Sequence, residues 1–203
     1  MKEYFALMFG LVFVQNFVLS QFLGLCPFIG VSKRRDSAIG MGVAVVFVMT
    51  LACIVTMLFY KLVLARAAWM GLGMSEYLDI VSFILVIAAL VQFVEIVMRK
   101  VAPALYQMLG IYLPLITTNC AILGATQLKF KAYGQLPLGE ALLKNTILGI
   151  FGGIGFTLAI FLMAGIRERI EYAPVPECMK GVPIAFIAAA CMALAFFGFA
   201  GIV

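Results

Sequence analysis

The chain has 203 residues, of which 66% are hydrophobic and only 11% charged, and its mean hydropathy is +1.18. Because soluble domains hold roughly 45–50% apolar residues, this composition predicts an integral membrane protein with a single domain over residues 1–203. The absence of histidine excludes histidine general-base chemistry and histidine-ligated haem. The net charge of +5 arises from Lys and Arg scattered among short loops, so no nucleic-acid partner is expected.

The first apolar segment covers residues 4–31 without a charged side chain. A continuous helix of that length would measure about 42 Å, whereas the hydrocarbon core of a bilayer is about 30 Å thick. We therefore expect a break at Gly24, Pro27 and Gly30, because proline removes a backbone donor and glycine tolerates unusual dihedrals. No small-residue cleavage site follows the segment, and we expect it to remain in the membrane.

The pattern of the first segment returns in the second half of the chain. Residues 101–128 are again free of charge and again longer than one crossing needs, with Gly110 and Pro114 as the predicted break. The other spans are predicted over residues 37–60, 80–98, 145–166 and 181–203.

These six transmembrane spans form two halves of similar design, about residues 1–100 and 101–203, each beginning with a broken helix. Three crossings in the first half start the second half on the opposite side, so the sequence predicts an all-α fold of two inverted three-helix repeats. Such repeats commonly place a functional site near the bilayer midplane, at discontinuous helices. The loops after the first, third and fifth spans hold eight of the 14 Lys and Arg, which weakly favours both termini on the outer side.

Two cysteines stand in matching frames within the two broken segments. Cys26 and Cys120 lie 94 residues apart, and each is followed by glycine four residues later. Thiolates bind soft metals and iron-sulfur clusters, and a cluster usually takes four ligands, so a second protein would have to supply the others. Free cysteine is also often a small buried hydrophobe, and both interpretations remain open on the residues alone.

The remaining candidates are weaker. Asn16, and in the second broken segment Thr117, Thr118 and Asn119, would either line an ion path, donate hydrogen bonds to cluster sulfurs, or join helices to one another. Glu95 and Arg99, four residues apart, are expected to pair at the interface.

The other three cysteines and the common motifs give no further site. Cys53 and Cys191 are interpreted as packing residues, and Cys178 lies in a charged loop. The chain has no Walker loop, GxGxxG, HExxH or CxxC motif. Flavin and nucleotide binding are therefore expected to belong to other proteins.

Three stretches carry a resemblance that covers essentially the whole chain: NFVLSQFLGLCPFIGVSK, LYQMLGIYLPLITTNCAILG and the ending from AGIRERIEYAPVPECMK onward. They resemble the A subunits of Rnf complexes, the ion-translocating ferredoxin:NAD oxidoreductases. The related E subunits of sodium-translocating NADH:quinone oxidoreductases share this plan and are the alternative within the family.

The resemblance implies a 2Fe-2S cluster held in the membrane, with Cys26 and Cys120 as two ligands and two more from the homologous Rnf E subunit. It also implies the other Rnf subunits (B, C, D and G) as partners, the cell inner membrane as location, and electron transfer coupled to movement of Na⁺ or H⁺. The chain would be a non-autonomous subunit of a redox-driven translocase, without a catalytic site of its own.

Two functions of other classes also fit the pattern. Inverted repeats with broken helices serve secondary transporters, which need no metal. A scaffold that only anchors soluble redox partners would tolerate replacement of both cysteines. Bound iron separates the electron carrier from the transporter, and cysteine replacement separates it from the scaffold.

Overall fold

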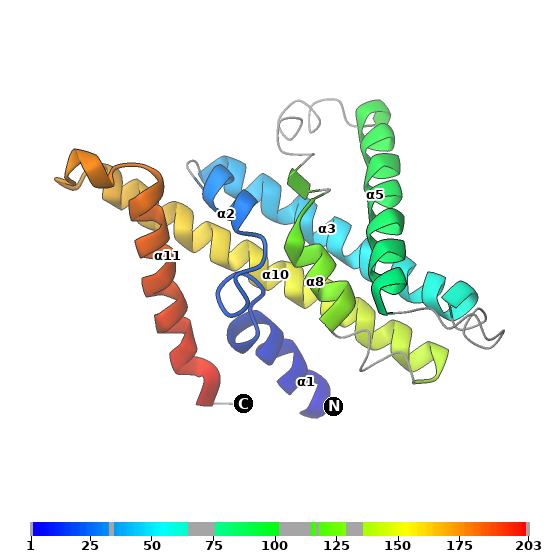
Figure 1. Ribbon diagram of the computed structural model, residues 1–203. Helices are drawn as coiled ribbons and strands as arrows, with labels where there is room; N and C mark the ends of the chain where they lie inside the picture. Colours follow the sequence, from blue (N-terminus) through cyan, green and yellow to red (C-terminus); the bar gives the residue numbers. More distant parts are fainter. Residues whose placement is uncertain are drawn as a thin grey trace.

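The computed structural model describes residues 2–32, 35–64, 76–101, 115–116, 118–128 and 136–201. Within these ranges every regular element is a helix, as predicted (Figure 1). The α-helices are α1 (Lys2–Phe9), α2 (Leu25–Val31), α3 (Arg35–Phe59), α5 (Glu76–Val101), α8 (Cys120–Leu128), α10 (Leu138–Glu171) and α11 (Val182–Phe197). Two π-helical stretches, Gly10–Val14 and Tyr60–Leu64, continue α1 and α3, and two short 3-10 helices cover Glu177–Met179 and Gly198–Gly201.

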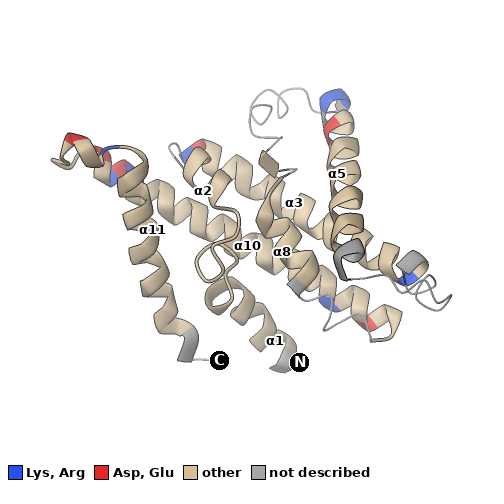
Figure 2. Ribbon diagram, viewed as in Figure 1, with Lys and Arg blue, Asp and Glu red and all other residues tan. Residues whose placement is uncertain are grey.

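Three helices in the described part of the chain are long and apolar enough to cross a membrane: Arg35–Leu62, Ile80–Val97 and Leu138–Glu171. They correspond to the predicted second, third and fifth spans. Shorter apolar helices, Tyr4–Val14 and Val182–Phe197, fall within the predicted first and sixth spans. Figure 2 shows the charged residues gathered at the helix ends, with uncharged ribbon between them, as expected of a chain that crosses a bilayer. The count of six spans and their inverted arrangement remain predictions.

The fifth span is longer than the sequence predicted. Instead of covering residues 145–166, α10 begins at Leu138 after Pro137 and ends at Glu171. Glu140 in its first turn suits a helix start, because the positive end of the helix dipole favours an acidic side chain there. Lys144 and Arg167, the charged residues that flank the predicted span, mark the limits of the apolar region. The helix itself continues past both of them.

Helix α10 packs along α3, and the two run antiparallel side by side (Figure 1). Two glycines of α10, four residues apart, allow this close approach: a Cβ on Gly149 would lie 2.7 Å from the Thr50 Cα, and one on Gly153 would lie 2.7 Å from the Val46 Cα. This small-xxx-small spacing is typical of closely packed membrane helices, so the sequence holds a signal for this contact that the lengths of the apolar runs do not reveal. Nearby, Asn145 Nδ2 donates to the Cys53 carbonyl oxygen at 2.7 Å.

The first helix breaks earlier than predicted. Helical geometry ends at Val14 and resumes at Leu25, so the irregular stretch is residues 15–24. Gly24, one of the three predicted break residues, precedes α2 with a φ of +79°, a conformation that glycine adopts without strain. The predictions for Pro27 and Gly30 were wrong, because both lie inside α2. Pro27 is tolerated because the first-turn N–H groups of a helix have no partner within it.

Candidate metal centre

The irregular stretch before α2 is held together by the side chain of Asn16, which is buried. Its Nδ2 donates to the carbonyl oxygens of Gly155 at 2.7 Å and Val12 at 3.1 Å. Its Oδ1 accepts from the N–H groups of Val18 at 3.0 Å and Leu19 at 3.5 Å. An amide side chain has two donors and one acceptor oxygen with two lone pairs, so the fold engages the whole hydrogen-bonding capacity of Asn16.

The start of α8 depends on Asn119, the residue before Cys120. Its Oδ1 accepts the N–H of Ala121 at 3.0 Å, which is the ordinary geometry of a helix N-cap. Asn119 is buried, and its Nδ2 has no hydrogen-bond partner among the described residues. Thr118 is exposed, whereas Thr117 and the predicted break residues Gly110 and Pro114 lie outside the described residues.

The starts of α2 and α8 meet. A Cβ on Gly24 would lie 2.8 Å from Asn119 Oδ1, 2.9 Å from a ring carbon of Phe156 and 3.1 Å from the Ala121 Cβ. Gly24, the N-cap residue of α2, therefore packs closely between Asn119, the N-cap of α8, and Phe156 in the middle of α10. This contact brings together two chain segments that are about a hundred positions apart.

Cys26 and Cys120 occupy the first turns of these two touching helices. Cys26 is the second residue of α2, Cys120 is the first of α8, and both side chains are exposed. The adjoining residues Pro27, Phe28 and Ala121 are buried, so the thiols lie on the outer side of a packed junction. The Sγ of Cys120 approaches the Thr118 carbonyl oxygen at 3.9 Å. Two exposed thiols in the first turns of these helices are the right residue type for half of a four-thiolate ligand set.

No group of three or more His, Cys, Asp or Glu side chains that could hold a metal occurs within the described ranges. The ligand assignment of Cys26 and Cys120 therefore stays a prediction that depends on a second protein.

The other singled-out residues lie elsewhere. Cys53 is fully buried in α3, as a packing residue should be, and Cys178 is exposed in its loop. Cys191 is exposed on α11, so its interpretation as a packing residue within this chain was wrong. Arg99 and Glu95 pair at 3.4 Å, as predicted.

One residue with a clear role was not predicted from the sequence. Arg167, near the end of α10, donates from Nη1 to the carbonyl oxygen of Ile29 at 2.6 Å and to the Ser32 Oγ at 3.0 Å. These acceptors form the C-terminal end of α2, where a cation also offsets the negative end of the helix dipole. Helix α2 is thus fixed at both ends, by Gly24 against α8 and by Arg167 of α10. The only sequence signal for this role is that Arg167 is a basic residue at the edge of a predicted span. That signal does not distinguish it from an ordinary basic residue in a loop.

An all-helical chain with long apolar helices, whose charges gather at the helix ends, belongs to the class of helical membrane proteins. Residues 4–203 match the Rnf-Nqr subunits, described as membrane proteins, and the chain belongs to this family.

Curated relatives match along nearly their whole length. The A subunit of the Na(+)-translocating ferredoxin:NAD(+) oxidoreductase complex of Acetobacterium woodii is 50% identical over 96% of this chain and 95% of its own. Proteins named as A subunits of ion-translocating oxidoreductase complexes are 48% identical in Syntrophotalea carbinolica and 49% identical in Vibrio cholerae, each over 100% of this chain and 99% of its own.

Proposed function

We propose that this chain is a membrane subunit of an ion-translocating ferredoxin:NAD oxidoreductase and that Cys26 and Cys120 hold one side of an intramembrane 2Fe-2S cluster. The observation that carries the proposal is the contact of Gly24, which precedes α2, with Asn119 and Ala121 at the start of α8, because both exposed thiols stand in the first turns of these two helices. The names of the relatives support the Rnf type over the related sodium-translocating NADH:quinone oxidoreductase.

The other two ligands come from a homologous membrane protein, the Rnf E subunit, which covers the junction. The thiolate form that ligates a cluster is charged and costly to expose to acyl chains, so ligand thiolates at the exposed Cys26 and Cys120 need a covering partner surface. Rnf subunits B, C, D and G complete the assembly in the inner membrane. The start of α1 and the end of α11 lie at the same end of the molecule, which accords with both termini on one side of the membrane (Figure 1).

A bound 2Fe-2S cluster would supply one-electron transfer. The chain's own residues would fix where that transfer occurs. Gly24 and the Asn119 cap hold the two thiol-bearing turns against each other, while Arg167 holds the far end of α2. Asn119 Nδ2, a buried donor without a partner among the described residues, is well suited to donate a hydrogen bond to a sulfur at the junction.

Coupling to Na⁺ or H⁺ follows as part of the proposal. Added negative charge in a low-dielectric site is costly unless a cation approaches or the surrounding helices rearrange. Two half-helices that meet at Gly24 are the elements of this chain that such a rearrangement would move. Loss of ion-dependent electron transfer on replacing Cys26 or Cys120 is expected; its persistence would contradict the coupling.

The direct test measures iron, acid-labile sulfide and the EPR signal of the reduced complex after purification with its membrane partner. We expect Cys26→Ser and Cys120→Ser each to remove one cluster signal and about two iron atoms per complex, because a 2Fe-2S cluster needs all four ligands. Cys191→Ser is the matched control, since Cys191 is also an exposed cysteine on an apolar helix.

Each other outcome points to a different function. If both ligand variants kept their iron, their EPR signals and their electron transfer, the chain would be a scaffold that anchors redox partners. A complex in which this chain carries ion flux without any dependence on either cysteine would instead favour a secondary transporter.

A further inference from the structure

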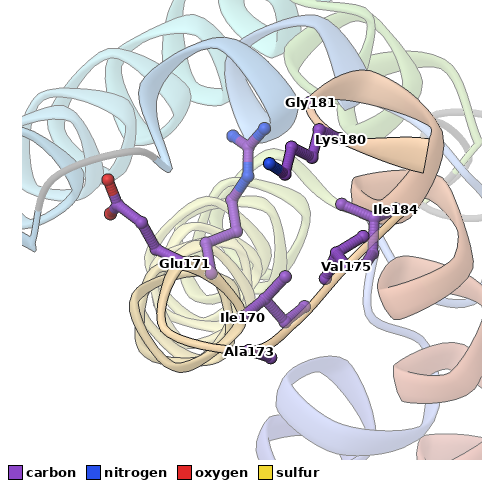
Figure 3. Close-up of a pocket in the computed structure, with 8 residues that line it drawn as sticks. Ile170, Glu171, Ala173, Val175, Lys180, Gly181 and Ile184 are labelled. Carbon is purple, nitrogen blue, oxygen red and sulfur yellow. The ribbon is translucent and has the colours of Figure 1, made fainter. Parts of the chain in front are cut away.

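A cavity of about 520 Å³ opens where α10 ends and α11 begins. Arg167 and Ile170 of α10, Val175 and Lys180 of the connecting loop, and Ile184 of α11 line it (Figure 3). Its size lies within the range of small-molecule sites. It is separate from the α2–α8 junction, since neither thiol nor Asn119 lines it.

The cavity wall holds two cationic side chains, Arg167 and Lys180, and one acidic side chain, Glu171. Lys180 points into it in Figure 3, whereas the Glu171 carboxylate points away from Lys180. The acceptors that Arg167 reaches, the Ile29 carbonyl and the Ser32 hydroxyl, are both uncharged. Lys180 approaches Glu177 only at 3.9 Å, and that carboxylate is 97% exposed. Among the described side chains, Lys180 thus has only this long ion pair with an exposed carboxylate, and the recorded partners of Arg167 are uncharged.

The start of α11 adds backbone donors. Gly181 precedes α11 and also lines the cavity, and none of the described side chains caps this helix. The first N–H groups of a helix have no partner within it and favour anions. Because Pro183 has no N–H, the donors of this first turn are the N–H groups of Val182 and Ile184, next to the lining residue Gly181.

The position of the cavity along the helices matches headgroup depth. Arg167 stands near the end of the apolar span Leu138–Glu171, and Tyr172 directly after it is 87% exposed, as interfacial aromatic residues often are. Beyond the cavity, α11 presents exposed apolar side chains at Val182, Phe186 and Ile187. A ligand with an anionic head and an apolar tail would find complementary surface for both parts.

We propose that this cavity binds the phosphate headgroup of an anionic phospholipid. Lys180 and Arg167 contact the phosphate, Ile170, Val175 and Ile184 pack against the glycerol and upper acyl region, and the acyl chains follow the apolar face of α11. Because Arg167 also holds the end of α2, the bound lipid becomes a neighbour of the helix that carries Cys26.

The test titrates the delipidated, purified complex with lipid and counts lipid adducts on this chain by native mass spectrometry. Phosphatidylglycerol, phosphatidylcholine with the same acyl chains, and glycerol phosphate are compared. We expect phosphatidylglycerol to bind in preference to the other two, and Lys180→Gln to weaken its affinity about fivefold, the equivalent of the roughly 1 kcal/mol that one basic side chain contributes at a lipid surface.

Lys100→Gln is the matched control, because Lys100 is an exposed cation at the end of α5 and does not line the cavity. Its affinity for phosphatidylglycerol should equal that of the unmodified complex. Arg167→Lys, which keeps the charge, should retain more binding than Arg167→Gln.

Four outcomes would overturn the proposal. Equal affinities for phosphatidylcholine and phosphatidylglycerol would mean that the cavity does not select lipids by the net charge of the headgroup. Glycerol phosphate binding as tightly as the lipid would assign the cavity to a soluble phosphate. Equal losses in Lys180→Gln and Lys100→Gln, or no adduct at all because another protein of the complex covers the cavity, would remove the lipid site.

Discussion

The irregular stretch before α2 and the start of α8 are built in opposite ways around one asparagine each. Asn16 is surrounded by four backbone groups and has no hydrogen-bonding capacity left. Asn119 caps its helix with Oδ1 and leaves Nδ2 buried without a partner in the described part of the chain. A buried polar atom without a partner costs about 1–3 kcal/mol, so such groups are uncommon in a chain that is complete by itself. The contrast is that backbone groups of this chain engage Asn16 fully, whereas Asn119 Nδ2 has no acceptor among the described residues.

The residue that joins the two breaks should be the most sensitive to substitution. Gly24→Ala would place a Cβ against Asn119, Phe156 and Ala121 and would also hold a non-glycine residue at a φ of +79°. We expect a loss of about 3 kcal/mol in the free energy of unfolding, from overpacking and backbone strain together, measured by SDS titration of the purified complex. Gly30→Ala is the control, because no described atom lies within 4 Å of its added Cβ. Equal stability of the two variants would show that the junction is not tightly packed.

Removing the side chain that completes the first break should come next. Asn16→Leu leaves buried donors and acceptors without partners, and we expect about 2–3 kcal/mol of destabilisation in the same SDS titration. Gln15→Leu, at an exposed neighbouring position, should change little. If Asn16→Leu kept its stability but lost ion-dependent electron transfer, Asn16 would belong to the ion path and not to the scaffold.

The cap of the second break should have a smaller effect on stability. Asn119→Ala removes the acceptor for the Ala121 N–H, which typically costs about 1 kcal/mol. Serine is also a good N-cap, so Asn119→Ser should restore most of the stability. A failure of serine to rescue would mean that Asn119 stabilises the chain by something other than its cap.

The smallest expected effect concerns Asn119 Nδ2, a donor that has no acceptor among the described residues. Asn119→Ser keeps a capping oxygen but removes Nδ2, so we expect a normal cluster content with a more negative midpoint potential, because hydrogen bonds to sulfur stabilise the reduced state. An EPR-monitored redox titration measures the change. Thr126→Ala, which removes a hydroxyl that donates to the Leu123 carbonyl of its own helix, should leave the potential unaltered. Equal potentials in all three proteins would exclude a tuning role for Asn119.

Local patterns predicted the parts of the fold that depend on local physics. Charge-free runs predicted the three long helices correctly, because each membrane-spanning segment must by itself avoid burying charge in lipid. The location of the first break depends instead on the bond from Asn16 to Gly155, across 139 positions of sequence. Residue types alone favoured Pro27, yet a first-turn proline is harmless.

The candidate site was predicted in its residues but not in its geometry. The matched frames of Cys26 and Cys120 indicated a shared role, which stays a prediction; the structure adds that both thiols are exposed in the first turns of their helices. That Gly24 contacts Asn119, and that Arg167 holds the far end of α2, are contacts between distant segments which no spacing rule contains.

Helix α10 has 34 residues, which corresponds to about 51 Å at 1.5 Å per residue, against a hydrocarbon thickness of about 30 Å. Even a tilt of about 40°, at the upper end of the usual range, would shorten its projection only to about 39 Å, so the helix must extend beyond the hydrocarbon core. It is clamped to α3 at Gly149 and Gly153, and its next residues, Gly155 and Phe156, touch Asn16 and Gly24. Adjacent residues of one long helix therefore contact both Asn16 and Gly24, so we expect a displacement of α10 to shift both of these residues together.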